Sequence, residues 1–270
     1  MRQDKISGAS EIESKAMKFV LKYAERKELF DRCLDMLKAY PSMGSLWNIA
    51  NFAFLYGKES EKKFEEMKDA NKKLIRKASS IIEDGAIIAT YSRSSTVLRI
   101  FEGCREKKIR IMCSESRPRY EGRKLAKELC NDFEIFFSTD ASLFSMIENA
   151  DLILIGADAI TENNVVNKIG TSVLASYAMQ LDKPLYVATT SYKAFPYVFI
   201  KEEDGKEIWR NAPCSIKIRN FYFDATPVNK ITYFITEKGV QREKPPFPED
   251  ISKEVDKISK ILSRKYQRVR

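Results

Sequence analysis

Residues 84–116 read DGAIIATYSRSSTVLRIFEGCREKKIRIMCSES, and this segment sets the fold class. A turn at Asp84-Gly85 is followed by the short apolar run Ala86–Thr90, a helix-like stretch from Ser95 to Lys107, and a second apolar run, Ile109–Ser114. Short runs rich in β-branched residues that alternate with helices predict parallel βαβ units with right-handed crossovers. The segment therefore predicts a parallel sheet covered by helices.

The same alternation continues toward the C-terminus. Further strands are expected at Glu134–Ser138, Leu152–Ile155, Leu185–Ala188, Phe221–Phe223 and Ile231–Ile235. Helices are expected from Glu121 to Cys130, from Ala141, and from Ile169 to Leu181. This pattern predicts a doubly wound, mostly parallel sheet with helices on both faces. Residues 194–213 are expected to form a long charged loop, which is either functional or merely variable.

Residues 11–82, upstream of this region, are expected to be helical, because apolar side chains recur at helical spacing. Pro41 interrupts the pattern, Ser42 is expected to cap the next helix, and Gly57 suits its end. We expect a helical domain over residues 1–82 and an α/β domain over residues 83–270. The second domain includes a C-terminal amphipathic helix and a basic tail, Arg264–Arg270, which is either solvated or in contact with an anionic partner.

Composition excludes several kinds of chemistry. The chain has 270 residues, 44% hydrophobic and 31% charged, no histidine, and five scattered cysteines without a C-x-x-C pair. Imidazole catalysis, Ser-His-Asp triads and zinc sites are therefore not expected, and neither a metal nor a cofactor is predicted. The sequence holds neither a membrane-length apolar run nor a cleavable leader pattern, so we expect a cytoplasmic protein without membrane contact.

The net charge of +9 permits contact with nucleic acid or an acidic protein surface, although it is also compatible with simple solubility. Neither a dinucleotide-binding glycine motif nor a phosphate-binding P-loop occurs in the sequence. GTP hydrolysis by the chain alone is therefore not expected.

Polar loops follow the predicted strands at one edge of the sheet: Tyr91–Ser95, Glu115–Pro118, Thr139–Asp140, Gly156–Asp158 and Asn167–Thr171. Hydroxyl and N–H groups of Ser94 and Ser95, together with Lys168 and Arg117, would suit a phosphate group. The alternative is that the serines only cap a helix and the lysine is solvated. Asp158 could act as a general acid or base if burial raised its pKa, or it could simply cap a turn.

Several phrases along the chain together resemble one known family. They are Ile6-Ser7-Gly8-Ala9-Ser10, Pro41-Ser42-Met43-Gly44-Ser45-Leu46, Thr90-Tyr91-Ser92-Arg93-Ser94-Ser95, Glu115-Ser116-Arg117-Pro118 with Gly122, Asp140-Ala141, Gly156-Ala157-Asp158, Asn167-Lys168-Ile169-Gly170-Thr171, Tyr192-Lys193, Arg219-Asn220 with Phe223-Asp224-Ala225-Thr226-Pro227, and Ile235-Thr236-Glu237-Lys238-Gly239. The chain resembles the alpha/beta/delta subunit family of translation initiation factor 2B. That family includes 5-methylthioribose-1-phosphate isomerase and ribose-1,5-bisphosphate isomerase.

The resemblance implies a helical N-terminal domain, a Rossmann-like second domain and a homodimer or higher oligomer formed through the latter. In the isomerase branches it also implies a cysteine after the first strand and an aspartate that exchange protons during aldose–ketose conversion. Asp158 matches the aspartate, whereas Ser92 stands at the position of the cysteine. The implied ligand is a phosphorylated sugar or nucleotide, and its implied contacts are Gly8, Ala9, Ser94, Ser95, Arg117, Asn167 and Lys168.

Two departures from the family pattern matter: the missing thiol, and a turn at Asn163-Asn164 that looks shortened and lacks its glycine. A serine hydroxyl is a much weaker acid than a thiol. We therefore expect a non-catalytic regulatory protein that retains a sugar-phosphate site and contacts initiation factor 2. The alternative is an isomerase that works without the cysteine. A third alternative is a metabolite-binding module unrelated to translation.

Overall fold

The computed structural model of the chain describes residues 8–270. Its N-terminal part is helical, as the periodicity predicts, with α1 (Ala9–Leu21), α2 (Leu29–Ala39), α3 (Gly44–Tyr56), the short 3-10 turn η1 (Gly57–Glu59) and α4 (Ser60–Ile81). Helix α3 ends where expected, at Gly57, which adopts a positive φ of 53°. The prediction that Ser42 caps α3 is wrong, because Met43 takes the cap position and forms no side-chain cap hydrogen bond.

The α/β part contains a seven-stranded sheet in the order β11-β10-β7-β4-β1-β2-β3. Its strands are β1 (Ile87–Ala89), β2 (Arg110–Ser114), β3 (Glu134–Ser138), β4 (Leu152–Gly156), β7 (Leu185–Ala188), β10 (Tyr233–Thr236) and β11 (Gly239–Gln241). Neighbouring strands pair in parallel except β10 with β11. Because the chain starts at β1 and winds outward in both directions, the sheet is doubly wound, which confirms the predicted fold class.

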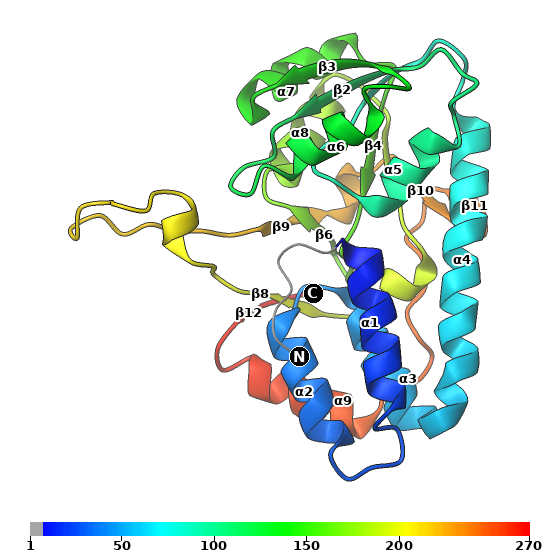
Figure 1. Ribbon diagram of the computed structural model, residues 1–270, viewed down its shortest axis with the longest axis vertical. Helices are drawn as coiled ribbons and strands as arrows, with labels where there is room; N and C mark the ends of the chain where they lie inside the picture. Colours follow the sequence, from blue (N-terminus) through cyan, green and yellow to red (C-terminus); the bar gives the residue numbers. More distant parts are fainter. Residues whose placement is uncertain (1–7) are drawn as a thin grey trace.

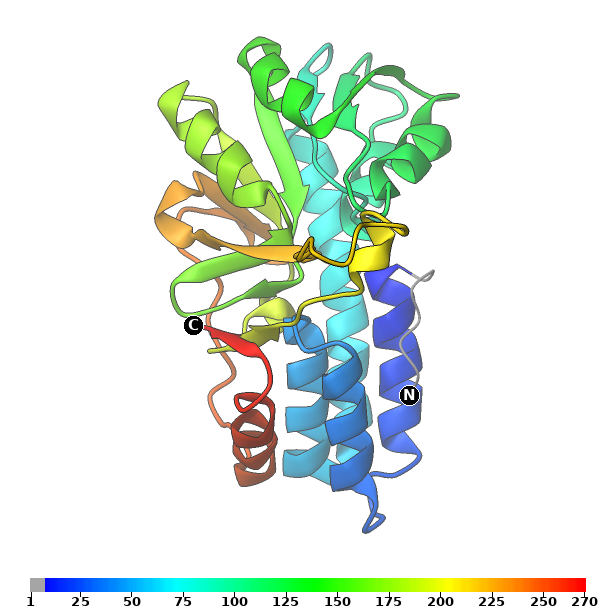
Figure 2. The same ribbon diagram turned by 90° about the vertical axis from the view of Figure 1, so that its left-hand side faces the viewer.

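Helices cover both faces of this sheet. Leu154 of β4 packs into a core cluster with residues of α4, α5 (Ser95–Glu102) and α6 (Glu121–Leu129). Its neighbours Ile153 and Ile155 point to the other face and join residues of α7 (Asp140–Met146), the following turn η2 (Ile147–Asn149) and α8 (Thr171–Gln180). Figure 2 shows α8, in yellow-green, separated by the strands from the side that carries α6.

Helix α3 connects the helical layer to the sheet. Every residue from 44 to 53 is buried, which is typical of a helix surrounded by protein. Trp47 stacks on Phe195 with ring centroids 5.6 Å apart. Asn48 donates hydrogen bonds to the carbonyl oxygens of Tyr192 and Ala194, at 2.8 and 2.9 Å, beside the short turn η3 (Ser191–Lys193) that follows β7. Figure 1 shows α4 running along the flank of both parts.

A second, three-stranded antiparallel sheet lies at the edge of the first: β5 (Ala159–Ile160), β6 (Asn164–Lys168) and β9 (Phe223–Pro227), in the order β5-β6-β9. This corrects two expectations. Asn167 and Lys168 end a strand instead of lying in a loop, and the strand expected at Phe221–Phe223 begins at Phe223. Burial of Val165 and Val166 stabilises β6. The polar residues at both ends of the strand hide its apolar pattern in the sequence.

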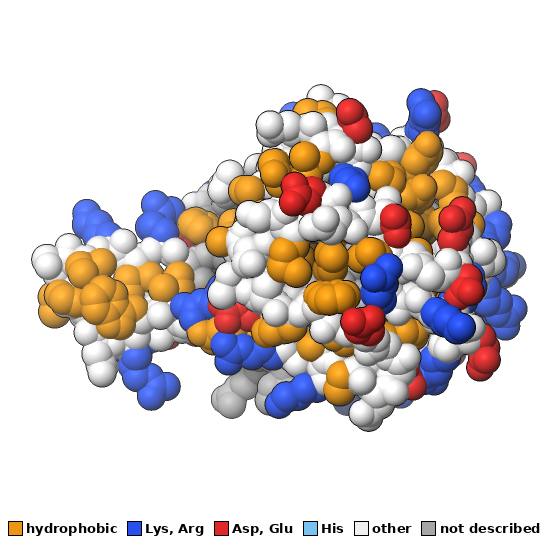
Figure 3. Space-filling view, turned by 90° about the horizontal axis from the view of Figure 1, so that it is seen from above, with side chains coloured by type: hydrophobic (Ala, Val, Ile, Leu, Met, Phe, Trp, Pro, Cys, Tyr) orange, Lys and Arg blue, Asp and Glu red, His pale blue; other side chains and the backbone are white. Residues whose placement is uncertain are grey.

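An arm of residues 201–220, drawn in yellow in Figure 1, projects from the body between β8 (Val198–Ile200) and β9. It contains one 3-10 helical turn, η4 (Gly205–Glu207). Ile208, Trp209 and Ile216 are 40%, 50% and 45% exposed. Figure 3 shows apolar side chains gathered on this projection. The long loop expected at 194–213 therefore begins later, because residues 198–200 form a buried strand.

The C-terminal segment returns to the helical layer through the turn η5 (Val228–Lys230), β10 and β11. The expected amphipathic helix is α9 (Lys253–Leu262), whose Val255, Ile258 and Leu262 join the core of α1–α3. The basic tail is held against the body by its backbone, because β12 (Gln267–Val269) pairs antiparallel with β8, and the Arg268 guanidinium lies 4.1 Å from the centroid of the Tyr197 ring. The side chains of Arg264, Lys265, Arg268 and Arg270 are exposed. The domain boundary between residues 82 and 83 stays a prediction. Within residues 8–270, no helix has the length and apolar character required to cross a membrane.

Candidate functional site

A cavity of about 210 Å³ lies between the carboxyl edge of the large sheet and the helical layer. Ser92, which follows β1, and Asp158, which follows β4, both line it. These two strands are neighbours at the point where the winding of the sheet reverses, which is where doubly wound sheets bind ligands. The start of α1, the segment Tyr40–Met43 before α3, and the ends of β6 and the arm complete the wall.

The structure brings five of the nine predicted site residues into this cavity: Gly8, Ala9, Ser92, Asp158 and Lys168. The other four, Ser94, Ser95, Arg117 and Asn167, do not line it. Ile6 and Ser7, which belong to the first phrase of the resemblance, lie outside the described residues. The four residues that do not line the cavity instead contact other protein groups around it.

Ser94 and Ser95 hold two helices in place. The Ser94 Oγ accepts a hydrogen bond from the Val97 N–H at 3.4 Å and caps α5. A Cβ at Gly156 would lie only 2.4 Å from this Oγ, so Ser94 also requires the glycine at the end of β4. The Ser95 Oγ is 2.7 Å from the Ser10 Oγ and connects α5 to α1.

Arg117 and Asn167 also contact protein groups. The Arg117 guanidinium lies 4.8 Å from the centroid of the Tyr120 ring and donates a hydrogen bond to the Tyr120 hydroxyl. The Asn167 side-chain amide donates to the Thr171 Oγ1 at 3.2 Å and fixes the start of α8. Both side chains therefore have partners within the protein.

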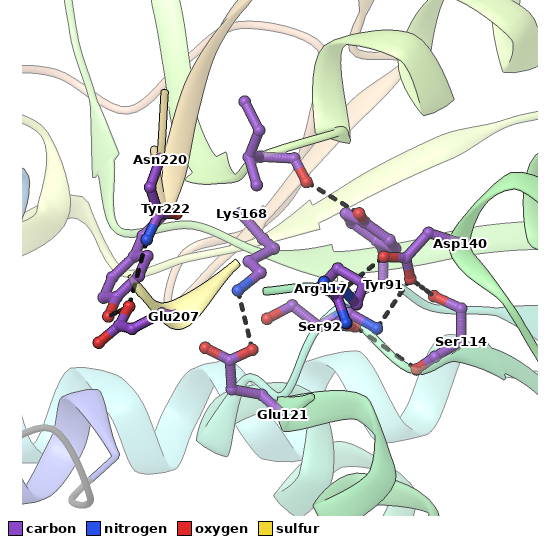
Figure 4. A network of polar contacts seen from close by, with 12 residues as sticks. Tyr91, Ser92, Ser114, Arg117, Glu121, Asp140, Lys168, Glu207, Asn220 and Tyr222 are labelled. Atoms are coloured by element: carbon purple, nitrogen blue, oxygen red, sulfur yellow. Dashed lines mark hydrogen bonds and ion pairs between the residues drawn. The ribbon is translucent and has the colours of Figure 1, made fainter. Parts of the chain in front are cut away.

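Asp140 organises the loop after β2, a role that sequence reasoning missed. Its carboxylate accepts hydrogen bonds from the Ser114 hydroxyl at 2.6 Å and from the N–H groups of Ser116 and Arg117, both at 2.7 Å. The Ser116 Oγ in turn accepts from the Ser92 N–H at 3.0 Å. Figure 4 shows this chain of contacts leading from Asp140 to Ser92. The position of Asp140 in the sequence could have indicated this role, because Thr139–Asp140 follows β3 and β3 lies next to β2 in the sheet.

Ser92 has a φ of 68°, in the left-handed region that non-glycine residues seldom adopt. Its N–H is held by Ser116, so the strained backbone is fixed by the neighbouring loop. None of the five cysteines, all within the described residues, lines the cavity. The nearby strand residue Cys113 is buried, which raises its pKa to about 12. A reactive thiol is therefore absent from the lining described here.

Asp158 is held at the cavity wall by its backbone. Its N–H donates to the Val166 carbonyl and its own carbonyl accepts from the Gly44 N–H, both at 2.9 Å. Burial raises the pKa of its carboxyl to about 6, a shift that Lys193 and Lys168 oppose and that Glu13 and Glu121 reinforce. A carboxyl with a pKa near neutrality can either give or take a proton.

Lys168 is the most buried cation of the cavity, with 3% of the residue exposed. Its Nζ lies 2.8 Å from a Glu121 carboxylate oxygen and 5.6 Å from the centroid of the Tyr222 ring. Burial lowers its pKa, and Glu121 opposes that shift. Figure 4 shows Lys168 facing Glu121, with Tyr222 to one side. An anion that binds Lys168 must compete with Glu121.

Other charges of the cavity are also paired. Arg93 makes two hydrogen bonds to the Glu128 carboxylate, at 2.7 and 2.9 Å, and Lys201 lies 3.2 Å from Glu203. Arg119 stacks over Tyr222 at 5.3 Å. Among the described residues, no three His, Cys, Asp or Glu side chains come together in a group that could hold a metal ion.

Comparison with known proteins identifies the family. A model of the initiation factor 2 subunit family matches residues 10–243. The chain belongs to this family. A Pyrococcus horikoshii protein described as eIF-2B subunit 2-like is 34% identical, over 89% of this chain and 93% of that protein. An Archaeoglobus fulgidus ribose 1,5-bisphosphate isomerase is 31% identical, over 88% and 86%.

A solved structure supports the same conclusion. The crystal structure of the Pyrococcus horikoshii translation initiation factor eIF-2B superposes with a TM-score of 0.77 at 33% identity, covering 93% of this chain and 95% of that one. The resemblance seen in the sequence is thereby confirmed. Because relatives of similar identity include both factor-like proteins and an isomerase, family membership leaves the choice between regulation and catalysis to the site.

Proposed function

We propose that this member of the family is a non-catalytic regulatory protein of the initiation factor 2B type whose cavity binds a phosphorylated sugar or nucleotide. Ser92 carries the proposal: it lines the same cavity as Asp158, at the position where the resemblance implies a thiol. A hydroxyl is a far weaker acid than a thiol, and the chain has no histidine to activate it. Proton exchange therefore lacks one of its two partners.

The charges of the cavity favour an anionic ligand. The lining includes five cations, Arg93, Arg119, Lys124, Lys168 and Lys201, against three carboxylates, Glu121, Asp158 and Glu203. Lys168 is buried, so its field is weakly screened by water. A sugar phosphate would place its phosphate toward these cations and its hydroxyls toward the polar groups of the wall.

One observation favours an isomerase as the second candidate. The pKa of Asp158 is raised to about 6, which suits a group that exchanges protons near neutral pH. Water or the Ser92 hydroxyl would then have to serve as the second proton carrier. The two candidates share the ligand and differ only in turnover.

Ribose 1,5-bisphosphate and methylthioribose-1-phosphate are the probes that separate the candidates. We expect calorimetry to detect binding of at least one of them, and NMR to detect no ketose. Ketose formation that disappears in Asp158→Asn would establish the isomerase instead. Ser92→Cys tests the missing thiol directly, and we expect it to gain turnover, whereas the exposed control Ser80→Cys gains none.

The proposal extends to partners and location: contact with initiation factor 2, a homodimer or higher oligomer, and cytoplasmic residence. The exposed Ile208, Trp209 and Ile216 of the arm support self-association, because exposed apolar clusters mark interaction surfaces. Light scattering during gel filtration measures the oligomeric state. A pull-down and nucleotide-exchange assay with the cognate factor 2 tests the partner, and failure to bind would argue against the regulatory role.

A further inference from the structure

A second cavity, of about 270 Å³, lies on the other side of the start of α1. Ile12 of α1 lines the first cavity, whereas Ser10, Glu13 and Ser14 line the second. The remaining lining comes from α3, α4, α5 and the segment after β7: Ser45, Met67, Lys68, Asn71, Lys72, Thr96, Arg99, Thr190 and Lys193 with Met17 of α1. No residue is shared between the two linings.

The helix faces that meet at this second cavity are polar. Ser10, Glu13 and Ser14 share one face of α1 at spacings of three and four residues, and Lys68, Asn71 and Lys72 share one face of α4 in the same way. Helices that pack closely normally turn apolar stripes toward each other. The polarity of both faces therefore indicates that this space is built for a polar occupant.

Three buried polar atoms of the lining lack hydrogen-bond partners: Glu13 Oε1, Ser45 Oγ and Asn71 Oδ1. They are three of the seven such side-chain atoms found in residues 8–270. Ser45 as a whole is only 1% exposed. Each unsatisfied buried group costs about 1–3 kcal/mol, so native proteins rarely gather several of them. A ligand with hydrogen-bond donors would satisfy all three oxygen atoms.

Cations line another part of the same cavity. Lys68 and Lys72 pair with Glu65 and Asp69, but these side chains are between 47% and 68% exposed, so the pairs are weak and exchangeable. Arg99 is exposed and lines the cavity beside them. Met17 and Met67 add an apolar wall. One cavity thus offers an anionic acceptor, several cations and an apolar surface.

We propose that this second cavity binds a free α-amino acid in its zwitterionic form. The ammonium group donates to Glu13, Asn71 and the Ser45 hydroxyl, the carboxylate binds Arg99 and the lysines of α4, and an apolar side chain lies against Met17 and Met67. A sugar phosphate fits less well, because it offers the Glu13 carboxylate only neutral hydroxyl donors. This inference does not depend on the function proposed for the first cavity.

The experiment is a calorimetric screen of the standard L-amino acids against the full chain. We expect one apolar amino acid to bind at a single site. Its carboxamide, which lacks the carboxylate, and its deaminated acid, which lacks the ammonium, should each bind at least about tenfold more weakly, equivalent to about 1.4 kcal/mol.

Two variants locate the site, with a matched control on the same helix. We expect Glu13→Gln and Asn71→Leu each to weaken amino-acid binding about tenfold, whereas Glu11→Gln, an exposed glutamate of the first turn of α1, leaves it unchanged. Lys168→Met removes a cation of the first cavity and should also leave it unchanged. Thermal melting shows whether each variant is folded. If either Glu13→Gln or Asn71→Leu misfolds, the other variant still tests the site.

Several outcomes would overturn the proposal. The first is that no amino acid binds at millimolar concentration, which would mean that water alone fills the cavity. The second is that Glu13→Gln and Glu11→Gln have equal effects on binding. The third is that a phosphorylated sugar competes for the Glu13-dependent site. Loss of sugar-phosphate binding in Lys168→Met together with retained amino-acid binding would support both cavities independently. Failure of the sugar-phosphate probes alone would affect only the function proposed for the first cavity.

Discussion

The two cavities flank the first turns of α1, but they differ in whether their buried polar groups have partners within the protein. In the first, Lys168 is paired with Glu121 and Lys201 with Glu203. In the second, Glu13 and Asn71 each leave a buried oxygen without a partner in residues 8–270. An anion in the first cavity must therefore displace the buried pair of Lys168 with Glu121, whereas in the second cavity the buried oxygen atoms are open and only the exposed Lys68 and Lys72 are paired.

Gly44 lies between Met43, which lines the first cavity, and Ser45, which lines the second, and its replacement should have the largest effect. A Cβ at Gly44 would lie 2.2 Å from the Lys193 carbonyl oxygen and 3.1 Å from the Ala159 Cβ. Both contacts are rigid, so α3 must move away from the sheet. We expect Gly44→Ala to lower the free energy of unfolding by about 3 kcal/mol, as measured by urea denaturation.

Gly8→Ala is the matched control at the start of another helix. A Cβ there would meet the Arg93 Nη1 at 3.3 Å, and the end of that side chain can shift. We expect a change of about 0.5 kcal/mol or less. Equal losses in the two variants would show that Gly44 does not position α3 against the sheet.

Asp158→Asn tests how strongly the first cavity perturbs its carboxylate. The pKa of Asp158 is raised to about 6 by burial, whereas an unfolded aspartate has a pKa of about 3.9. Near pH 4 and below, the folded carboxyl is protonated and its burial adds no charge penalty. As the pH rises from about 4 to 6, the unfolded state ionises first, so the contribution of Asp158 to stability falls.

At a pH of about 7.5 we therefore expect Asp158→Asn to be more stable than the original chain by about 2 kcal/mol, since one pKa unit corresponds to about 1.4 kcal/mol and partial exposure reduces the effect. Near pH 4 the gain should vanish. Denaturation at both pH values measures this difference, with the exposed Asp35→Asn of α2 as control. A gain that does not depend on pH would contradict the raised pKa.

Glu121→Gln would make the first cavity resemble the second, because it leaves the buried Lys168 without a charged partner. Lys168 then keeps a hydrogen-bond acceptor but no counter-charge at 2.8 Å. We expect the affinity for ribose 1,5-bisphosphate to rise about tenfold, or about 1.4 kcal/mol, by calorimetry. The control is Glu115→Gln, whose partner Arg123 does not line the cavity. Unchanged affinity would mean that the anion does not contact Lys168.

The sequence predicted the sheet better than the site, and particular residues show why. Strands such as Leu152–Ile155 carry their signal locally, in an unbroken apolar run. Ser94 and Ser95 looked like phosphate ligands because a helix cap and an anion site use the same residue types. Glu121 was seen only as the start of a helix, since its partner Lys168 lies in a distant strand. The second cavity exists only because α1 packs beside α4, which no local pattern encodes.

The smallest expected effect comes from the hydroxyl groups of Ser45 and Ser60. Both residues are essentially buried, but Ser60 donates to the Gly57 carbonyl at 2.7 Å, whereas the Ser45 Oγ has no partner in the described part of the chain. Removing a satisfied hydroxyl loses a hydrogen bond, so Ser60→Ala should lower the free energy of unfolding by about 1 kcal/mol. Ser45→Ala removes an unsatisfied group, and without added amino acid it should leave stability unchanged or raise it by up to about 1 kcal/mol. Urea denaturation of the two variants compares them directly. A loss in Ser45→Ala as large as that in Ser60→Ala would show that Ser45 is satisfied in solution, and the contrast between the two cavities would then rest on Glu13 and Asn71 alone.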